Sequence, residues 1–158
     1  MFDFLRKTKF KVVSPAKGKI KSIAEVQDEA FSSKSMGDGF AIEPDKGEVY
    51  SPIDGVVEML FPTLHALGLK SSNGTEVLIH IGLETVELNG EGFKTFVSQG
   101  QKVKAGDKLV EFDIESIKTK VPSTDIMVIF TSGESFELIK KDAVVEASEE
   151  EIVNIIKK

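Results

Sequence analysis

Two proline-opened turns in distant parts of the chain share one pattern, and they constrain the fold more than any other feature. Residues 14–18 read Ser-Pro-Ala-Lys-Gly, and residues 51–55 read Ser-Pro-Ile-Asp-Gly. Proline presets the backbone at the start of a turn, and each turn leads into an apolar run that fits a strand. A second pattern, glycine and aspartate before a strand-like run, occurs at residues 37–42 and again at 106–111. The sequence therefore predicts a fold made of two similar half-units.

The chain from residue 12 onward is a succession of short apolar or alternating runs separated by Gly, Pro, Asn and Asp. This is an all-β pattern, and with the repeat it predicts an antiparallel β-sandwich or barrel of the duplicated type, with one or two short helical turns. Asp113 is placed to cap one such turn, running as far as Val121. Residues 126–130 are predicted to form a fully buried strand. Residues 149–158 have helical propensity, but the all-β context favours a closing strand.

Length and composition exclude several classes of protein. At 158 residues and 41% hydrophobic content, the chain fits a single domain, which we expect to span residues 12–158. The absence of cysteine excludes disulfides, thiolate metal sites and a cysteine nucleophile. A net charge of −6 argues against nucleic-acid binding. With no apolar run of membrane-spanning length and no signal peptide, a cytoplasmic location is expected.

The first eleven residues form a separate segment in this interpretation. Phenylalanines and a leucine alternate there with lysines and an arginine. Such a segment is either a weakly basic amphipathic tail that rests on an anionic membrane surface or a flexible terminus.

The stretch from Thr75 to Gly82 places an imidazole within an apolar strand. Val77 and Ile79 would point to one face of this strand, and Leu78 and His80 to the other. Gly82 leaves space over the ring, which titrates near neutral pH in its ordinary environment. A core histidine bonded to a neighbouring strand would explain this strand taken alone.

A second histidine, His65, lies in the preceding hydrophobic segment, and two adjacent antiparallel strands would bring the two rings together. Thr63 lies two residues before His65 and would share its face, where its hydroxyl could donate to a phosphoryl oxygen or hold the ring. A neutral imidazole could accept a phosphoryl group while a second ring stabilises the added charge. Alternatively, His65 and His80 could be two ligands of a zinc ion, although no recognised ligand motif surrounds them.

Five segments carry a resemblance to a known family, at residues 36–42, 51–55, 63–66, 77–88 and 90–93. Together they resemble the glucose-type enzyme IIA of the bacterial phosphoenolpyruvate-dependent sugar phosphotransferase system. The resemblance extends from about residue 11 to the end of the chain. It implies a duplicated hybrid β-sandwich, a free-standing subunit without a fused transporter, and no required cofactor.

The same resemblance implies the roles of the site residues. His80 matches the histidine that receives a phosphoryl group from the carrier protein HPr, as tele-phosphohistidine, and passes it to a cysteine of the IIB domain of a sugar permease. His65 matches the second histidine, which assists transfer to IIB and is not itself the carrier, and Thr63 matches a threonine that hydrogen-bonds in the site. Association with the membrane would then be peripheral, through the permease or the N-terminal tail.

Partner recognition is expected around the two histidines. An apolar depression would present an exposed docking surface, and two acidic residues would face a basic residue of the carrier. The expected apolar residues are Phe31, Phe40, Phe61, Leu78 and Val86, and the acidic ones are Asp28 and Glu84. Leu78 and Glu84 stand where some family members have phenylalanine and aspartate.

Rival and additional functions remain open from the sequence. A zinc-dependent hydrolase or peptidase would use His65 and His80 as metal ligands. The segment Gly100–Asp107 is also typical of biotinyl- or lipoyl-carrier domains, but the chain lacks the modified-lysine motif of those domains. A regulatory role, in which phosphorylation of His80 changes the binding of other proteins, is compatible with the main interpretation. The sugar is not identified by this sequence, because the permease binds it.

Overall fold

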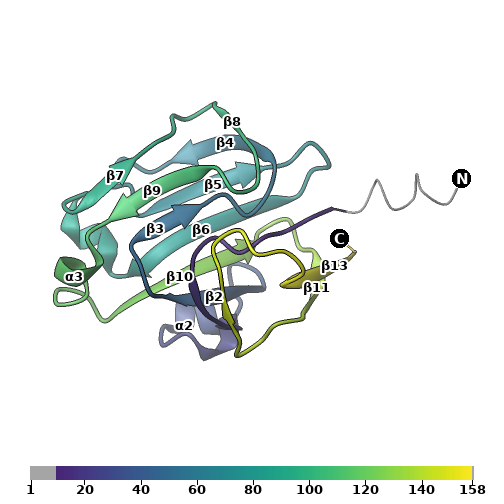
Figure 1. Cartoon of the computed structure of the whole chain (residues 1–158), viewed down its shortest axis with the longest axis horizontal. Coiled ribbons are helices and arrows are strands. Elements are labelled where there is room, and N and C mark those ends of the chain that lie inside the picture. The colour runs from purple at the N-terminus through teal and green to yellow at the C-terminus, as the bar shows by residue number, and fades with distance from the viewer. Residues whose placement is uncertain (1–9, 158) are drawn as a thin grey trace, which may run out of the picture.

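The computed structural model describes residues 10–157, and this part of the chain is dominated by short strands (Figure 1). The thirteen strands of this part are β1 (Gly18–Ser22), β2 (Gly39–Pro44), β3 (Glu48–Tyr50), β4 (Gly55–Leu60), β5 (Ala66–Lys70), β6 (Glu76–Leu83), β7 (Phe93–Thr95), β8 (Lys102–Val103), β9 (Lys108–Phe112), β10 (Ser123–Phe130), β11 (Ser135–Leu138), β12 (Val144–Val145) and β13 (Val153–Lys157). The helical turns are η1 (Ile23–Glu25), α2 (Glu29–Ser32), η2 (Thr85–Leu88) and α3 (Ile114–Ile117). The predicted all-β fold class is confirmed.

The strands form one large antiparallel sheet and two small ones. The large sheet has the order β12-β1-β2-β10-β6-β5-β4-β8. A three-stranded sheet, β3-β9-β7, and a two-stranded sheet, β11-β13, complete the sandwich. Figure 1 shows β3 and β9 lying across the large sheet, which places the core between these layers.

The order of the large sheet reveals the predicted duplication. From its middle outward, β10-β2-β1-β12 in one half matches β6-β5-β4-β8 in the other. The two proline-opened turns enter β1 and β4, which are equivalent positions. Both turns contain the same hydrogen bond, from the Ser14 hydroxyl to the Ala16 carbonyl and from the Ser51 hydroxyl to the Ile53 carbonyl, each 2.7 Å long.

The glycine-aspartate turns were predicted to be equivalent parts of the two half-units, and this prediction was wrong. The glycine-aspartate turn at residues 37–38 leads into β2 of the large sheet, whereas the turn at 106–107 leads into β9 of the three-stranded sheet. The structural equivalent of the second turn is instead Glu146–Glu149. In each case the acidic side chain that ends the turn accepts from the backbone N–H three residues earlier, at 2.9 Å for Asp107 and 2.8 Å for Glu149. Gly-Asp is common turn chemistry, so its recurrence carries little information about fold.

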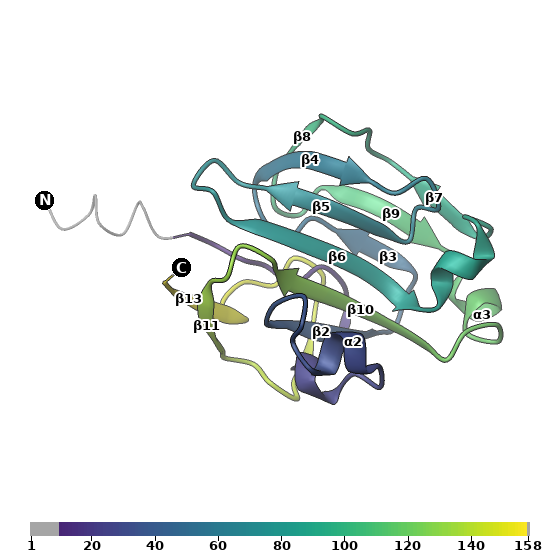
Figure 2. The same ribbon diagram turned by 180° about the vertical axis from the view of Figure 1, so that it is seen from behind.

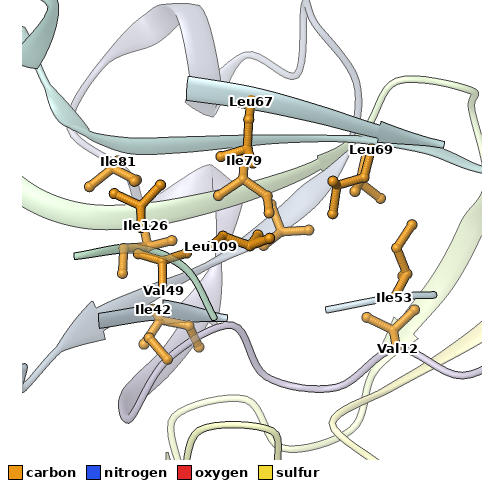
Figure 3. Packing of buried hydrophobic residues seen from close by; sticks show 14 of the residues in the cluster. Val12, Ile42, Val49, Ile53, Leu67, Leu69, Ile79, Ile81, Leu109 and Ile126 are labelled. Atoms are coloured by element: carbon orange, nitrogen blue, oxygen red, sulfur yellow. The ribbon is translucent and has the colours of Figure 1, made fainter. Parts of the chain in front are cut away.

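The main core lies between the large sheet and the small sheets. Figure 3 shows Leu67, Ile79 and Ile126 of the large sheet pointing towards Val49 and Leu109 of the three-stranded sheet. All five side chains are fully buried in one cluster. Alternation along β6 sends Val77, Ile79 and Ile81 into this core and leaves Leu78 and His80 on the other face of the sheet.

A second, smaller cluster covers part of that other face. Residues 23–38 leave β1 and return to β2, and Figure 2 shows α2 of this excursion beside β2 and β10. Ile23, Val26 and Phe31 pack there against Met127 and Ile129 of β10. With apolar layers on both faces, residues 126–130 are fully buried, as predicted for this strand.

The remaining expectations had mixed outcomes. Asp113 caps α3 as predicted, accepting from the Ser116 N–H at 3.2 Å, but α3 ends at Ile117 and not at Val121. The C-terminal segment forms the strand β13, as predicted. Among the described residues, no helix has the length and apolar character needed to cross a membrane.

The proposed N-terminal tail lies mostly outside the described residues. Of its residues, Phe10 packs against the main core, and Lys11 forms an exposed ion pair with Glu150 at 3.2 Å.

Candidate functional site

His80 lies near the end of β6, on the face opposite the main core. In the register of the large sheet it pairs with Met127 of β10 on one side and with Ala66 of β5 on the other. The side chain is half-buried. His80 therefore lies at the edge of the second cluster, which residues 23–38 form on this face of the sheet. Its ring and that of Phe31 are in a T-shaped arrangement, with their centroids 4.9 Å apart.

A backbone carbonyl fixes the orientation of the His80 ring. Nδ1 of His80 lies 2.9 Å from the carbonyl oxygen of Gly82. A carbonyl only accepts, so Nδ1 carries the proton and the neutral ring has its lone pair on Nε2. Gly82 turns its carbonyl towards the ring with a φ of +74°, a conformation that favours glycine.

His65 stands beside His80, as the sequence indicated. It immediately precedes β5, and its carbonyl accepts from the N–H of Ile81 at 2.7 Å. The two imidazole centroids are 5.0 Å apart with the rings nearly perpendicular, at 82°. The Thr63 hydroxyl lies 2.6 Å from Nδ1 of His65, which leaves Nε2 of that ring for other contacts.

The environment keeps both rings neutral near physiological pH. Burial lowers the pKa of His80, with a further contribution from His65, and together they bring it to about 4 despite opposing effects of the Gly82 carbonyl and Asp28. Burial also lowers the pKa of His65. From the sequence, the His80 imidazole was expected to titrate near neutral pH. Its burial among apolar side chains lowers its pKa because desolvation disfavours the charged form of the ring. His80 is thus a neutral nitrogen base over the whole physiological range.

Each of the two histidine rings contacts the ring of a phenylalanine. Phe31 contacts His80, and Phe61 contacts His65 at a centroid distance of 5.5 Å. Leu78 is half-buried on the same face of β6 as His80, and Val86 of η2 is 45% exposed. Phe31 itself is buried, with only 6% of its surface exposed, and so differs from the exposed residue that was expected. We call Phe31, Phe61, Leu78 and Val86 the docking surface, after the role predicted for them.

Phe40 does not belong to this surface, so its assignment was wrong. It is fully buried on the opposite face of the sheet, where its ring packs against Phe130 at 6.4 Å in the main core. In β2 it is the neighbouring Ala41 that faces the second cluster. A shift of one residue along a strand exchanges the two faces of a sheet.

The two acidic residues of the predicted site, Asp28 and Glu84, differ in the hydrogen bonds that they make. Asp28 caps α2, accepting from the N–H of Ala30 at 2.9 Å, and its charge acts on His80. Glu84 is exposed, adopts a left-handed conformation with a φ of +60° before η2, and makes no capping hydrogen bond. Asp28 therefore acts on the His80 ring from the start of α2, whereas Glu84 lies at the start of η2, four residues after His80 in the sequence.

Metal ligands are sparse around the two histidines. Within residues 10–157, no group of three or more His, Cys, Asp or Glu side chains is arranged to hold a metal ion. His65 and His80 would supply two ligands, whereas a catalytic zinc site normally takes three from the protein.

Sequence reasoning assigned no role to Thr85. Its side chain is fully buried and its hydroxyl donates to the carbonyl of Ile81 at 2.5 Å. A threonine three residues after a glycine at the end of a strand does not by itself predict such a hydrogen bond. The bond from Thr85 to Ile81 forms only because the chain turns back through the left-handed conformations of Gly82 and Glu84.

Comparisons with known proteins agree with this geometry. Residues 10–136 match the family model described as phosphoenolpyruvate-dependent sugar phosphotransferase system, EIIA 1. The chain is 52% identical over 129 residues to the glucose-specific EIIA component of Bacillus cereus, covering 82% of this chain and 78% of that protein. It is 44% identical over 149 residues to the corresponding component of Mycoplasma capricolum, covering 93% and 95%. The structure of glucose permease IIA from Mycoplasma capricolum superposes with a TM-score of 0.84 at 42% identity, over 94% of this chain and 95% of that one.

Proposed function

This chain belongs to the EIIA 1 family of the phosphoenolpyruvate-dependent sugar phosphotransferase system, and from that membership we propose that it carries a phosphoryl group on Nε2 of His80. One observation supports this assignment more than any other. Nδ1 of His80 is committed to the Gly82 carbonyl, so the nucleophilic lone pair is on Nε2, next to the ring of His65.

The first transfer is an in-line displacement at phosphorus. Nε2 of His80 donates its lone pair to the phosphorus of phospho-HPr, a new N–P bond forms, and the bond between phosphorus and HPr breaks with its electron pair leaving on HPr. The His80 ring keeps its proton on Nδ1, and this N–H continues to donate a hydrogen bond to the Gly82 carbonyl. A pKa of about 4 means that no separate base is needed to provide the neutral ring.

His65 acts as a hydrogen-bond donor to the phosphoryl group bound on His80 and assists its transfer to IIB. When the Thr63 hydroxyl donates to Nδ1 of His65, the proton of that ring lies on Nε2 and is available for a phosphoryl oxygen. The phosphoryl group adds a charge of roughly −1.5 to −2 at neutral pH. A neighbouring donor offsets this charge in the transition state and in the phosphoprotein.

The second transfer passes the phosphoryl group to a cysteine of a sugar permease IIB domain. The thiolate attacks phosphorus and the N–P bond breaks, which returns the lone pair to Nε2 of His80. The relatives' names support glucose as the sugar served. We place the protein in the cytoplasm, in peripheral contact with the membrane through the permease.

The docking surface and the acidic pair would receive both partners. Apolar side chains around the histidines exclude water on contact, and Asp28 and Glu84 attract a basic residue of HPr. Phosphorylation places negative charge in the middle of this surface, so binding of other, regulatory proteins would change with it. The transfer chemistry needs no cofactor, and the family match does not support a zinc hydrolase.

The test is intact-mass analysis after incubation with phosphoenolpyruvate, enzyme I and HPr. Wild type and His65→Ala should each gain one acid-labile phosphoryl group, and His80→Ala should gain none. His65→Ala should then fail in transfer to IIB. No mass gain in the wild type, with donor proteins shown to be active on another acceptor, would refute the proposal.

A further inference from the structure

The two peptide groups that flank Ile81 are each held by a hydrogen bond to an element of the site. The N–H of Ile81 donates to the His65 carbonyl at 2.7 Å, and the carbonyl of Ile81 accepts from the Thr85 hydroxyl at 2.5 Å. Thr85 is fully buried, so no water competes for this carbonyl. A buried hydrogen bond of this kind fixes the plane of the peptide to which it is made.

The methyl group of Thr85 restricts the same place sterically. A Cβ atom built on Gly82 would lie 2.5 Å from Cγ2 of Thr85 and 3.0 Å from the carbonyl oxygen of Ser123. Gly82 is thus enclosed between η2 and the start of β10, and only a residue without a side chain fits.

These contacts form a continuous path from Thr85 to the nucleophile. The plane of the Ile81–Gly82 peptide is the reference from which the φ of +74° and the ψ of Gly82 set the direction of the Gly82 carbonyl. That carbonyl is the acceptor for Nδ1 of His80 at 2.9 Å. Its direction therefore decides both the rotation of the ring and which ring nitrogen keeps the proton.

We propose that Thr85 is a positioning residue for phosphoryl transfer: its buried hydroxyl and methyl group hold the Ile81–Gly82 turn so that the Gly82 carbonyl selects the Nδ1–H tautomer of His80. The proposal rests on the proposed function of His80 as phosphoryl acceptor. Thr85 itself does not touch the phosphoryl group. Without its hydroxyl, the turn would relax and the lone pair would be divided between the two ring nitrogens.

The experiment compares Thr85→Val, which keeps the shape and loses the donor, with Thr85→Ser, which keeps the donor. Thr95→Val is the matched control, because the Thr95 hydroxyl also donates to a backbone carbonyl, that of Val97 at 2.9 Å, but in the three-stranded sheet. Nitrogen-15 NMR of the imidazole rings in the unphosphorylated proteins reports the tautomer of His80. Rapid-quench kinetics with phospho-HPr report the rate of phosphoryl acceptance.

We expect wild type, Thr85→Ser and Thr95→Val to show the Nδ1–H tautomer of His80. Thr85→Val should show a mixture of tautomers and accept the phosphoryl group about five- to tenfold more slowly, the factor that one lost hydrogen bond represents. The maximal rate should fall and the concentration of HPr at half-maximal rate should stay within about twofold, since the docking surface is unchanged.

Two results would overturn the inference without touching the function of His80. One is a Thr85→Val protein with the wild-type tautomer and rate. The other is an equal loss of rate in Thr95→Val, which would show a general effect on the fold. Failure of the wild type to accept a phosphoryl group would instead refute the proposed function.

Discussion

Replacing Gly82 with alanine tests whether the turn after β6 sets the geometry of His80. A φ of +74° costs an L-residue about 1–2 kcal/mol. The new methyl group would also lie 2.5 Å from Cγ2 of Thr85 and 3.0 Å from the Ser123 carbonyl oxygen. Relief of such overpacking typically costs about 1–3 kcal/mol. We therefore expect Gly82→Ala to lower the free energy of unfolding by about 2–5 kcal/mol.

Gly68 of the adjacent strand β5 provides the control for this substitution. A Cβ atom on Gly68 would meet its nearest neighbour, Cβ of Met59, at 3.9 Å, which is ordinary van der Waals contact. Its φ is not positive. Because glycine weakens a strand through its conformational freedom, Gly68→Ala should raise the free energy of unfolding by about 0.5–1 kcal/mol.

Urea unfolding of the three proteins measures both changes. With an m-value of about 2 kcal/mol per M, the midpoint for Gly82→Ala should fall by about 1–2.5 M and that for Gly68→Ala should rise slightly. In the folded Gly82→Ala protein, imidazole nitrogen-15 shifts should show that His80 has lost the Nδ1–H tautomer, whereas Gly68→Ala should keep it. An unchanged midpoint and an unchanged tautomer in Gly82→Ala would refute the assignment of Gly82 as the residue that orients the ring.

Three further predictions follow from the burial and charge of individual side chains in the site and in the core. With a pKa of about 4 for His80 in the folded state and 6.5 as its ordinary value, the unfolded chain binds the proton first as pH falls. The free energy of unfolding should therefore decrease by about 2–3 kcal/mol as the pH falls from 6.5 to 4. Urea unfolding across that range should show a smaller decrease for His80→Gln than for the wild type. Phe40→Ala should cost about 3–5 kcal/mol in urea unfolding because Phe40 is fully buried, whereas Val86→Ala, at an exposed position, should change stability by less than about 0.5 kcal/mol and slow transfer from HPr. Chelation with EDTA should leave phosphoryl acceptance unchanged, and a loss that zinc restores would contradict the cofactor-free mechanism.

The sequence contained the repeat and the pairing of the two histidines because both depend on local rules. Proline and glycine at fixed spacing determine the turns at residues 14–18 and 51–55, and strand alternation determines which residues share a face with His80. The neighbouring segment then has to return antiparallel, which brings His65 beside His80. These steps need no knowledge of long-range packing.

The parts that could not be predicted depend on contacts between distant segments. Phe40 and Ala41 are adjacent residues in a strand with apolar layers on both faces, so alternation alone does not say which residue faces the docking surface. The pKa of His80 also depends on burial by Phe31, which comes from a segment about fifty residues away in the sequence. Likewise, the contact of Thr85 with Ile81 exists only after the left-handed turn has formed.

The site arises where the two halves of the duplicated sheet differ. In the first half, β1 and β2 are joined by residues 23–38, which cover the face of β2, β10 and part of β6 with a second apolar cluster. In the second half, β4 and β5 are joined by the short turn of residues 61–65, which ends in a histidine. The cover therefore stops at His80, where Phe31 desolvates one side of the ring and His65 borders the other. Duplication supplies the scaffold, and the unequal connections leave an imidazole that is neutral, oriented and only half-buried, as the proposed role of His80 requires.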